Sequence, residues 1–208
     1  MGSDRDALLA GIDVSRETEV LLCRFVDLVE KWTARINLVS GNSLVDIWTR
    51  HVLDSAQLYR FVPDGAQHWA DLGSGAGFPG LVICILSRDR PEVLHMTLVE
   101  SDQRKAAFLR TAARELGLAP KVIAARIEHI QGLQADVLSA RALGPLAQLL
   151  NHADRHLSKT GVALFPKGRS AAAEIDRARR HWRFDLRSYP SMTDAEAQIL
   201  QIGNIAHV

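Results

Sequence analysis

Residues 71–80, with the sequence DLGSGAGFPG, have the composition of a ligand-binding loop. An acidic residue, Asp71, is followed by four glycines at every second or third position. Glycine adopts positive φ angles and lets the backbone approach a ligand closely. Between a strand and a helix, such a loop directs free backbone N–H groups toward whatever binds there. We therefore interpret residues 71–80 as a ligand site rather than an ordinary turn.

Two cofactors fit this loop, a dinucleotide and S-adenosylmethionine. Gly75, Gly77 and Gly80 satisfy the G-x-G-x-x-G pattern of dinucleotide-binding folds, but this match starts two residues late, because Gly73 already closes the strand. Enzymes that use S-adenosylmethionine place an acid two residues before the first glycine, as Asp71 stands before Gly73. An ionised carboxylate there repels a pyrophosphate and attracts an ammonium or sulfonium group. The loop therefore favours S-adenosylmethionine over NAD(P).

The elements around the loop alternate between strand-like and helix-like runs. This alternation predicts an α/β fold with a doubly wound, mostly parallel sheet. Two late strand-like runs lack a helix-length connection, so we expect them to form an antiparallel hairpin at the sheet edge. The parallel strands are expected at residues 68–72, 95–100, 121–124, 136–139 and 161–165, the helices between them at 79–87, 102–116, 145–157 and 170–181, and the hairpin at 184–189 and 198–205.

The first 64 residues are expected to form a helical appendage. Ser15 is placed to cap a helix that runs to residue 36 with its apolar residues on one face, and Ser43 is placed to cap a second helix. The sequence Pro63-Asp64-Gly65 then ends the helical region. Residues 65–208 are expected to form the cofactor-binding domain, and the two parts to form one compact unit.

Composition bounds the class of protein. No stretch of the 208 residues approaches the ~20 apolar residues of a membrane span, and the first residues lack a signal-peptide pattern. We therefore expect a cytoplasmic protein with no membrane partner. Cys23 and Cys84 have no partner spacing, so neither a disulfide framework nor a metal site is expected. Residues 167–187 carry seven basic and three acidic residues, which is compatible with nucleic acid meeting one face.

Residues that end the predicted strands carry the rest of the functional information, because ligands of open α/β sheets lie beyond these ends. Glu100 ends the second strand about 20 residues after the loop, where an acid accepts hydrogen bonds from ribose hydroxyls. Residues 126–128 follow the third strand, beside an expected adenine edge. Arg141 follows the fourth strand and Lys167 the fifth, and two such cations suit phosphate or a cofactor carboxylate.

Missing motifs narrow the chemistry. Tyr59 and Tyr189 are not followed by a lysine four residues later, which weakens the short-chain dehydrogenase alternative. Neither cysteine is placed as a nucleophile beyond a strand end, and residues 139–145 lack the Asn/Asp-Pro-Pro turn of many amine methylases. A nucleophile that needs no deprotonation, such as guanine N7, remains. Its methylation requires alignment and exclusion of water rather than a general base.

Several sequence blocks resemble the bacterial ribosomal RNA small-subunit methyltransferase G family, also called glucose-inhibited division protein B. The resemblance covers about residues 30–168. In chain order, the blocks are residues 36–38, Arg50-His51 with 53–55, residues 71–80, Glu100-Ser101 with Arg104-Lys105 and Phe108-Leu109, residues 139–142 and residues 165–168.

The resemblance implies a class I S-adenosylmethionine-dependent methyltransferase with a seven-stranded Rossmann-like sheet, which makes 7-methylguanosine in 16S ribosomal RNA. The implied partner is this RNA or the small ribosomal subunit, the protein acting as a monomer without a metal. Arg141 is expected to act by positioning and to touch both ligands. Expected cofactor contacts are Asp71, Gly73, Gly75, Phe78, Glu100, Ile127, Glu128 and Arg141, and expected RNA contacts are Arg50, His51, Arg104, Lys105 and Lys167.

Two alternatives remain open on the residues alone. An NAD(P)-dependent oxidoreductase rests on Gly75 to Gly80 and Glu100. A non-catalytic RNA-binding module that retains the fold rests on the basic residues of 167–187. Titration with each cofactor separates the first alternative from a methyltransferase, and labelled-methyl transfer separates the second.

Overall fold

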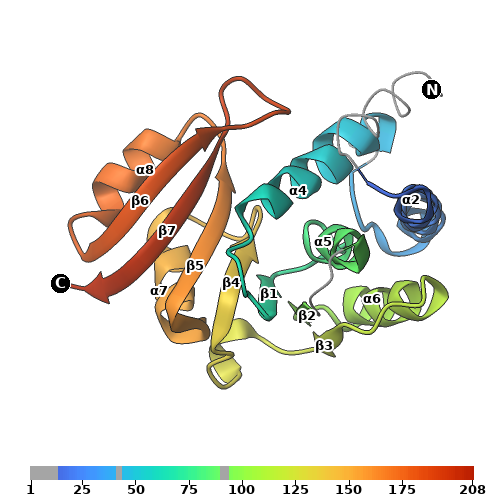
Figure 1. The fold of residues 1–208 in the computed structure, drawn as a ribbon, viewed down its shortest axis with the longest axis horizontal. Helices are drawn as coiled ribbons and strands as arrows, with labels where there is room; N and C mark the ends of the chain where they lie inside the picture. The colour runs from blue at the N-terminus through green and yellow to red at the C-terminus, as the bar shows by residue number, and fades with distance from the viewer. Residues whose placement is uncertain (1–13, 41–43, 90–93) are drawn as a thin grey trace.

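The computed structural model describes residues 14–40, 44–89 and 94–208. Its centre is a seven-stranded sheet with the strand order β3-β2-β1-β4-β5-β7-β6 (Figure 1). The first five strands pair in parallel, β7 is antiparallel to β5, and β6 is antiparallel to β7. The strands are β1 (His68–Leu72), β2 (His95–Val99), β3 (Lys121–Ile123), β4 (Ala135–Ala140), β5 (Leu157–Lys167), β6 (Trp182–Pro190) and β7 (Gln198–His207).

This sheet confirms the predicted Rossmann-like architecture, including the hairpin at the edge. The strand order reverses between β1 and β4, which is the place where α/β sheets of this kind bind ligands. The loop of residues 71–80 leaves β1 at that point.

Helices cover both faces of the sheet (Figure 1). Helices α2 (Arg16–Ile36), α5 (Gly80–Leu86) and α6 (Gln103–Glu115) lie together on one side, and α7 (Leu146–His156) and α8 (Ala171–Ala178) on the other. Successive strand residues point to opposite faces. Val137 accordingly joins the core under α5, and Leu138 joins the core under α7.

The N-terminal appendage packs onto the first of these cores. Ser15 caps α2 as expected, since its Oγ accepts a hydrogen bond from the Thr18 N–H at 3.2 Å. Phe25 and Val29 of α2 are fully buried in the same cluster as α5 and α6. Residues 1–13 and the expected cap at Ser43 lie outside the described residues.

The second helix differs from the expected regular one. It contains a π-helical turn η1 (Trp48–Leu53), a short α-helical piece α4 (Asp54–Ala56) and a 3₁₀ turn η2 (Gln57–Phe61). Isolated π-turns inside helices occur frequently at functional sites. The widened turn carries Arg50 and His51, two of the residues predicted to contact RNA.

Strand β5 begins four residues earlier than expected, directly after α7 ends at His156. After the buried Leu157, the next residues, Ser158 to Thr160, are polar and at least partly exposed, so they lack the apolar signal of a strand. A register shift between Ala135 and Val137 accommodates this extension. Among the helices of the described residues, none combines the length and apolar character needed to cross a membrane.

Candidate active site

The glycine loop turns sharply between β1 and α5. Gly73, Gly75 and Gly77 have φ angles of 68°, 54° and 89°, in the left-handed region that favours glycine. Gly80 is required for a different reason, because a Cβ there would lie 2.7 Å from Asp71 Oδ2. The spacing of the four glycines is therefore explained by backbone geometry.

Asp71 lies fully buried beneath this loop. Its Oδ1 accepts a hydrogen bond from Ser139 Oγ at 2.6 Å, and its Oδ2 accepts one from the Gly80 N–H at 3.2 Å. Trp69 Nε1 donates in turn to Ser139 Oγ at 2.9 Å. Burial raises the pKa of the Asp71 carboxyl to about 6, although these hydrogen bonds oppose the shift. The carboxyl thus joins β1, β4 and α5, and its contact with a cofactor stays a prediction.

Glu100 lies beside the loop at the end of β2. Its Oε2 accepts a hydrogen bond from the Gly75 N–H at 2.8 Å, and its Oε1 accepts one from the Asp102 N–H at 2.7 Å. The side chain is mostly buried. Glu100 thus lies next to the glycine turn as expected, and its contact with ribose hydroxyls stays a prediction.

Ile127 and Glu128 belong to a 3₁₀ turn, Ile127–His129, which follows β3. Ile127 is buried in the core under α7, whereas the Glu128 side chain is 54% exposed. They lie beyond the strand as expected, and their contact with adenine stays a prediction.

Phe78, His51 and Arg141 form a stack that joins the loop, the appendage and the end of β4. The rings of His51 and Phe78 are 5.0 Å apart with an interplanar angle of 23°. The Arg141 Cζ lies 5.6 Å from the centre of the Phe78 ring. Directly after Arg141, Ala142 has a φ of 53°, which is uncommon for a residue with a Cβ. The structure thus brings three predicted site residues together.

The Arg141 guanidinium is held by three hydrogen bonds. Its Nη1 donates to the Arg50 carbonyl oxygen at 2.9 Å and to Asp54 Oδ2 at 3.1 Å, and its Nη2 donates to His51 Nδ1 at 2.8 Å. A guanidinium has five N–H groups. Within the described part of the chain, these contacts leave the Nε–H and one Nη2–H for a ligand.

His51 is neutral in this arrangement. Arginine donates hydrogen bonds and accepts none, so Nδ1 of His51 is the acceptor and the ring proton resides on Nε2. Burial, with smaller effects from the charges of Arg141 and Arg50, lowers the pKa of His51 to about 4. The lone pair of its Nδ1 is occupied by Arg141. His51 therefore has no free basic nitrogen with which to take a proton.

A cleft of about 630 Å³ opens beside this stack. We use "the cleft" for the space bounded by η1, the residues after β4, the end of β5 and the turn of residues 191–197 between β6 and β7. Arg50, His51 and Arg141 line it.

Lys167 also borders the cleft, but its ammonium group is already bonded. Its Nζ donates to the Gly144 carbonyl oxygen at 2.7 Å and to Glu174 Oε2 at 2.8 Å, and its side chain is 10% exposed. Glu174 also accepts a hydrogen bond from the Leu146 N–H at the start of α7. These contacts indicate that Lys167 holds two segments together.

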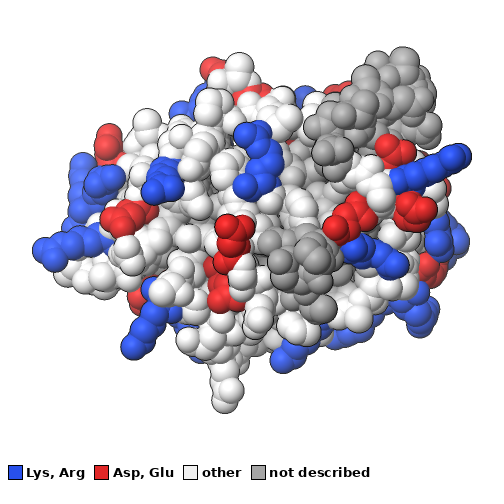
Figure 2. Space-filling model, in the orientation of Figure 1, with Lys and Arg blue, Asp and Glu red and all other residues white. Residues whose placement is uncertain are grey.

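The other predicted RNA contacts are more accessible. The Arg50 side chain is 66% exposed and pairs with Asp46 at 3.4 Å. Arg104 is 72% exposed and pairs with Asp102, and Lys105 follows it at the start of α6. Arg104 and Lys105 do not line the cleft. Figure 2 shows basic and acidic side chains interspersed over one face of the molecule rather than a single basic patch.

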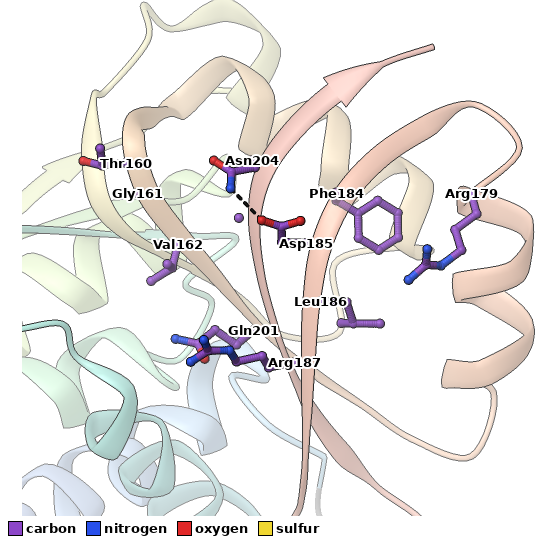
Figure 3. Close-up of a pocket in the computed structure, with 11 residues that line it drawn as sticks. Thr160, Gly161, Val162, Arg179, Phe184, Asp185, Leu186, Arg187, Gln201 and Asn204 are labelled. Carbon is purple, nitrogen blue, oxygen red and sulfur yellow. Dashed lines mark hydrogen bonds between the residues drawn. The ribbon is translucent and has the colours of Figure 1, made fainter.

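A second hollow, of about 680 Å³, lies on the C-terminal part of the sheet (Figure 3). Residues of β5, β6 and β7 line it, and Asn204 Nδ2 donates to Asp185 Oδ2 across it at 2.6 Å. It contains none of the predicted site residues. The cleft, which Arg50, His51, Arg141 and Lys167 line, is therefore the candidate active site.

Comparison with known proteins decides the family. The family model described as rRNA small subunit methyltransferase G matches residues 19–201. The chain belongs to this family. It is 50% identical over 204 residues to the ribosomal RNA small subunit methyltransferase G of Cereibacter sphaeroides, covering 98% of this chain and 99% of the relative. It is 51% identical over 197 residues to that of Ruegeria pomeroyi, covering 95% and 96%.

Solved structures bear out the fold. A TehB-like SAM-dependent methyltransferase from Corynebacterium glutamicum superposes with a TM-score of 0.57 at 14% identity, over 84% of this chain and 97% of the other. Membership of the small subunit methyltransferase G family confirms the resemblance found in the sequence. It makes the chain a methyltransferase, and leaves the oxidoreductase alternative without support.

Some residues of this family member reach the cleft without having been predicted. Asp54 lay within the recognised block 53–55 but was assigned no role, and Thr193 lies in a region without motifs. Glu174 does not line the cleft but bonds Lys167, which does, and the sequence indicated it only as one charge in a basic segment. The available signals for Asp54 were its place in that block and its position one helical turn after Arg50.

Proposed function

We propose that this protein transfers the methyl group of S-adenosylmethionine to N7 of a specific guanine in 16S ribosomal RNA. Family membership supports a small-subunit ribosomal RNA methyltransferase. The observation that carries the choice of N7 is the state of His51. It is the one histidine among the described residues that line the cleft, and its only lone pair is occupied by Arg141. A site whose histidine has no free lone pair suits a nucleophile that already has one.

The residues at the end of β1 and β2 fit S-adenosylmethionine. Three left-handed glycines create an open backbone turn, and the Glu100 carboxylate beside it is a suitable acceptor for ribose hydroxyls. Phe78, at the end of this turn, is buried and packs against the His51 ring and the Arg141 guanidinium, so it links the turn to Arg141. When bound, this cofactor supplies an electrophilic methyl group on a sulfonium.

The protein's own contribution is alignment and charge. Arg141 is fixed at the end of β4 with two N–H groups left for an acceptor on the cofactor or the RNA. Holding two reactants in the correct geometry supplies up to roughly 7–11 kcal/mol of a barrier. We propose that Arg141 performs this positioning, and that Arg50, His51, Arg104 and Lys105 contact the RNA.

Methyl transfer followed by mapping of the modified base tests the proposal. Purified protein is incubated with labelled S-adenosylmethionine and either naked 16S RNA or small ribosomal subunits. We expect incorporation at a single guanine, with the label released by cleavage chemistry specific for 7-methylguanosine. Incorporation on another atom would overturn the choice of N7. Binding of S-adenosylmethionine without any incorporation would favour the non-catalytic RNA-binding alternative.

The cellular setting follows from the substrate. Ribosomal RNA is encountered in the cytoplasm, where we propose that the protein acts as a monomer. Sedimentation of the protein alone and with RNA tests the monomer, and a dimer in both conditions would contradict it.

A further inference from the structure

Asp54 connects three segments that are distant in the sequence. Its Oδ2 accepts a hydrogen bond from Arg141 Nη1 at 3.1 Å. Its Oδ1 accepts hydrogen bonds from Thr193 Oγ1 at 3.0 Å and from Gln57 Nε2 at 2.9 Å. The carboxylate is 16% exposed, so these bonds are partly shielded from water. One side chain of the appendage thereby holds both the end of β4 and the 191–197 turn.

Gln57 strengthens the attachment of this turn. Its Nε2 donates to Ser191 Oγ at 3.2 Å, and its Oε1 accepts a hydrogen bond from the Met192 N–H at 2.8 Å. Gln57 itself is 3% exposed. The turn is therefore fixed by a buried amide and a shielded carboxylate on consecutive pieces of the same helical segment.

The 191–197 turn is also a wall of the cleft. Thr193, Asp194 and Ala197 line the cleft together with Arg50 and His51. A hinge at the turn would change the width of the cleft without altering the glycine loop, because the turn is attached through Asp54 and Gln57 rather than through β1.

We propose that Asp54 is a positioning residue for Arg141, and that the 191–197 turn is the RNA-facing wall that Asp54 holds in place. The proposal rests on the proposed function for its RNA substrate. Without the carboxylate, Arg141 loses the charge-assisted bond from its Nη1, and the turn loses its bond from Thr193 to the appendage while keeping the bonds made by Gln57. Both losses disturb the site from the RNA side and leave Gly73 to Phe78 in place.

Variants at Asp54 and at Thr193 separate the positioning of Arg141 from the attachment of the 191–197 turn. Asp54→Ala removes the bonds from Arg141 and from Thr193. Thr193→Val removes the bond from the turn to Asp54, together with the contact between Thr193 Oγ1 and Ser191 Oγ, and keeps the bond from Arg141 to Asp54. Asp89→Ala is a matched control, because Asp89 also accepts three hydrogen bonds, from Ser15 and Thr18 at the start of α2, away from the cleft. The steady-state constants for RNA and the affinity for S-adenosylmethionine are measured for each.

We expect Asp54→Ala to lower kcat/KM for RNA by about ten- to hundredfold, as for loss of a hydrogen bond to a charged group. Its affinity for S-adenosylmethionine should fall by less than kcat/KM for RNA, because the glycine loop and Glu100 do not depend on Asp54. Thr193→Val should raise KM for RNA by about threefold with little change in kcat. Asp89→Ala should lower the melting temperature while preserving both constants. Wild-type kinetics in Asp54→Ala, or equal kinetic losses in Asp54→Ala and Asp89→Ala, would overturn the positioning role.

A double-mutant cycle with Arg141→Ala tests whether Asp54 acts through Arg141. Residues that act as a unit give losses that do not add. We expect Asp54→Ala to cost less than about threefold in the Arg141→Ala background. Fully additive losses would contradict the proposal.

A physical readout keeps this proposal separate from the proposed function. Amide hydrogen exchange of residues 191–197 should speed up in Asp54→Ala and in Thr193→Val, and should not change in Asp89→Ala. Unchanged exchange in both cleft variants would refute the wall, whatever the activity. If wild-type protein methylates no RNA but the exchange responds as expected, the proposed function fails while the attachment of the turn by Asp54 stands.

Discussion

The cationic residues of the site differ in how fully their hydrogen bonds are already used by the protein. Lys167 bonds Gly144 and Glu174 at short distances and is nearly buried. Arg50 pairs with Asp46 over a longer distance and stays largely exposed. Both were predicted from sequence to contact RNA. Sequence alone does not show whether a lysine after a strand or an arginine in a helix is already bonded within the protein. Their surroundings in the fold separate them.

Arg50 and Lys167 should therefore respond differently to substitution. Removing one phosphate contact lowers the slope of log K against log salt by about one. We expect Arg50→Ala to do this, measured by RNA binding at several salt concentrations. Lys167→Ala should keep the slope and instead lower the free energy of unfolding by about 1–3 kcal/mol, because Glu174 loses a partner in a shielded site. A reduced slope with unchanged stability in Lys167→Ala would restore Lys167 as an RNA contact.

Elements of the fold were predictable where their signals were local. The β-α alternation identified the parallel strands, and the absence of a helix-length connection identified the hairpin of β6 and β7. Two features were missed. The π-turn η1 leaves no distinct apolar period, and the first residues of β5 are polar because they lie at a part-exposed end. Boundaries of that kind depend on tertiary pairing rather than on local composition.

The backbone conformation of the glycine loop predicts how a Cβ at Gly77 would affect stability. At Gly77 the φ is 89°, and an added Cβ would lie 2.8 Å from Leu81 Cδ1. We expect Gly77→Ala to lower the free energy of unfolding by about 1–3 kcal/mol through strain. Gly168→Ala is the control, because a Cβ there meets no atom within 4 Å. Equal stability of the two variants in denaturant titrations would contradict this account of the loop.

At the scale of the whole molecule, the site depends on contacts between distant parts of the chain. Sequence patterns located the glycine loop, Glu100 and Arg141, since each follows a predicted strand. They gave no role to Asp54 or Thr193, which are 139 positions apart and meet only in the folded protein. Local patterns cannot report such a contact. The neutral state of His51 was likewise not predictable, because it depends on Arg141 bonding its Nδ1.

Buried Asp71 should affect the stability of the whole molecule with pH. Burial raises the folded-state pKa of Asp71 to about 6 from 3.8. Between these values the unfolded chain loses the proton and the folded chain keeps it, so the contribution of Asp71 to stability falls as pH rises. The fall is on the order of 3 kcal/mol between about pH 4 and 6.

Comparison with Asp71→Asn isolates this effect. The lowered pKa values of Glu174, Asp89 and Asp102 produce the opposite trend, and they cancel in the difference between the two proteins. We expect the stability advantage of wild type over Asp71→Asn, from urea unfolding, to shrink from pH 4 to 6 and then stay level. A constant difference across this range would show that Asp71 ionises normally in the folded state.

The attachment of the 191–197 turn to Asp54 has a consequence for synthesis. A growing chain that has emerged as far as residue 168 already contains every predicted cofactor contact and the stack of Phe78, His51 and Arg141. It still lacks the last wall of the cleft, because Thr193 is added 25 residues later. The cleft is therefore completed only after residues 191–197 have been added, because Asp54 must meet Thr193, which lies 139 positions later in the chain, before RNA can be held.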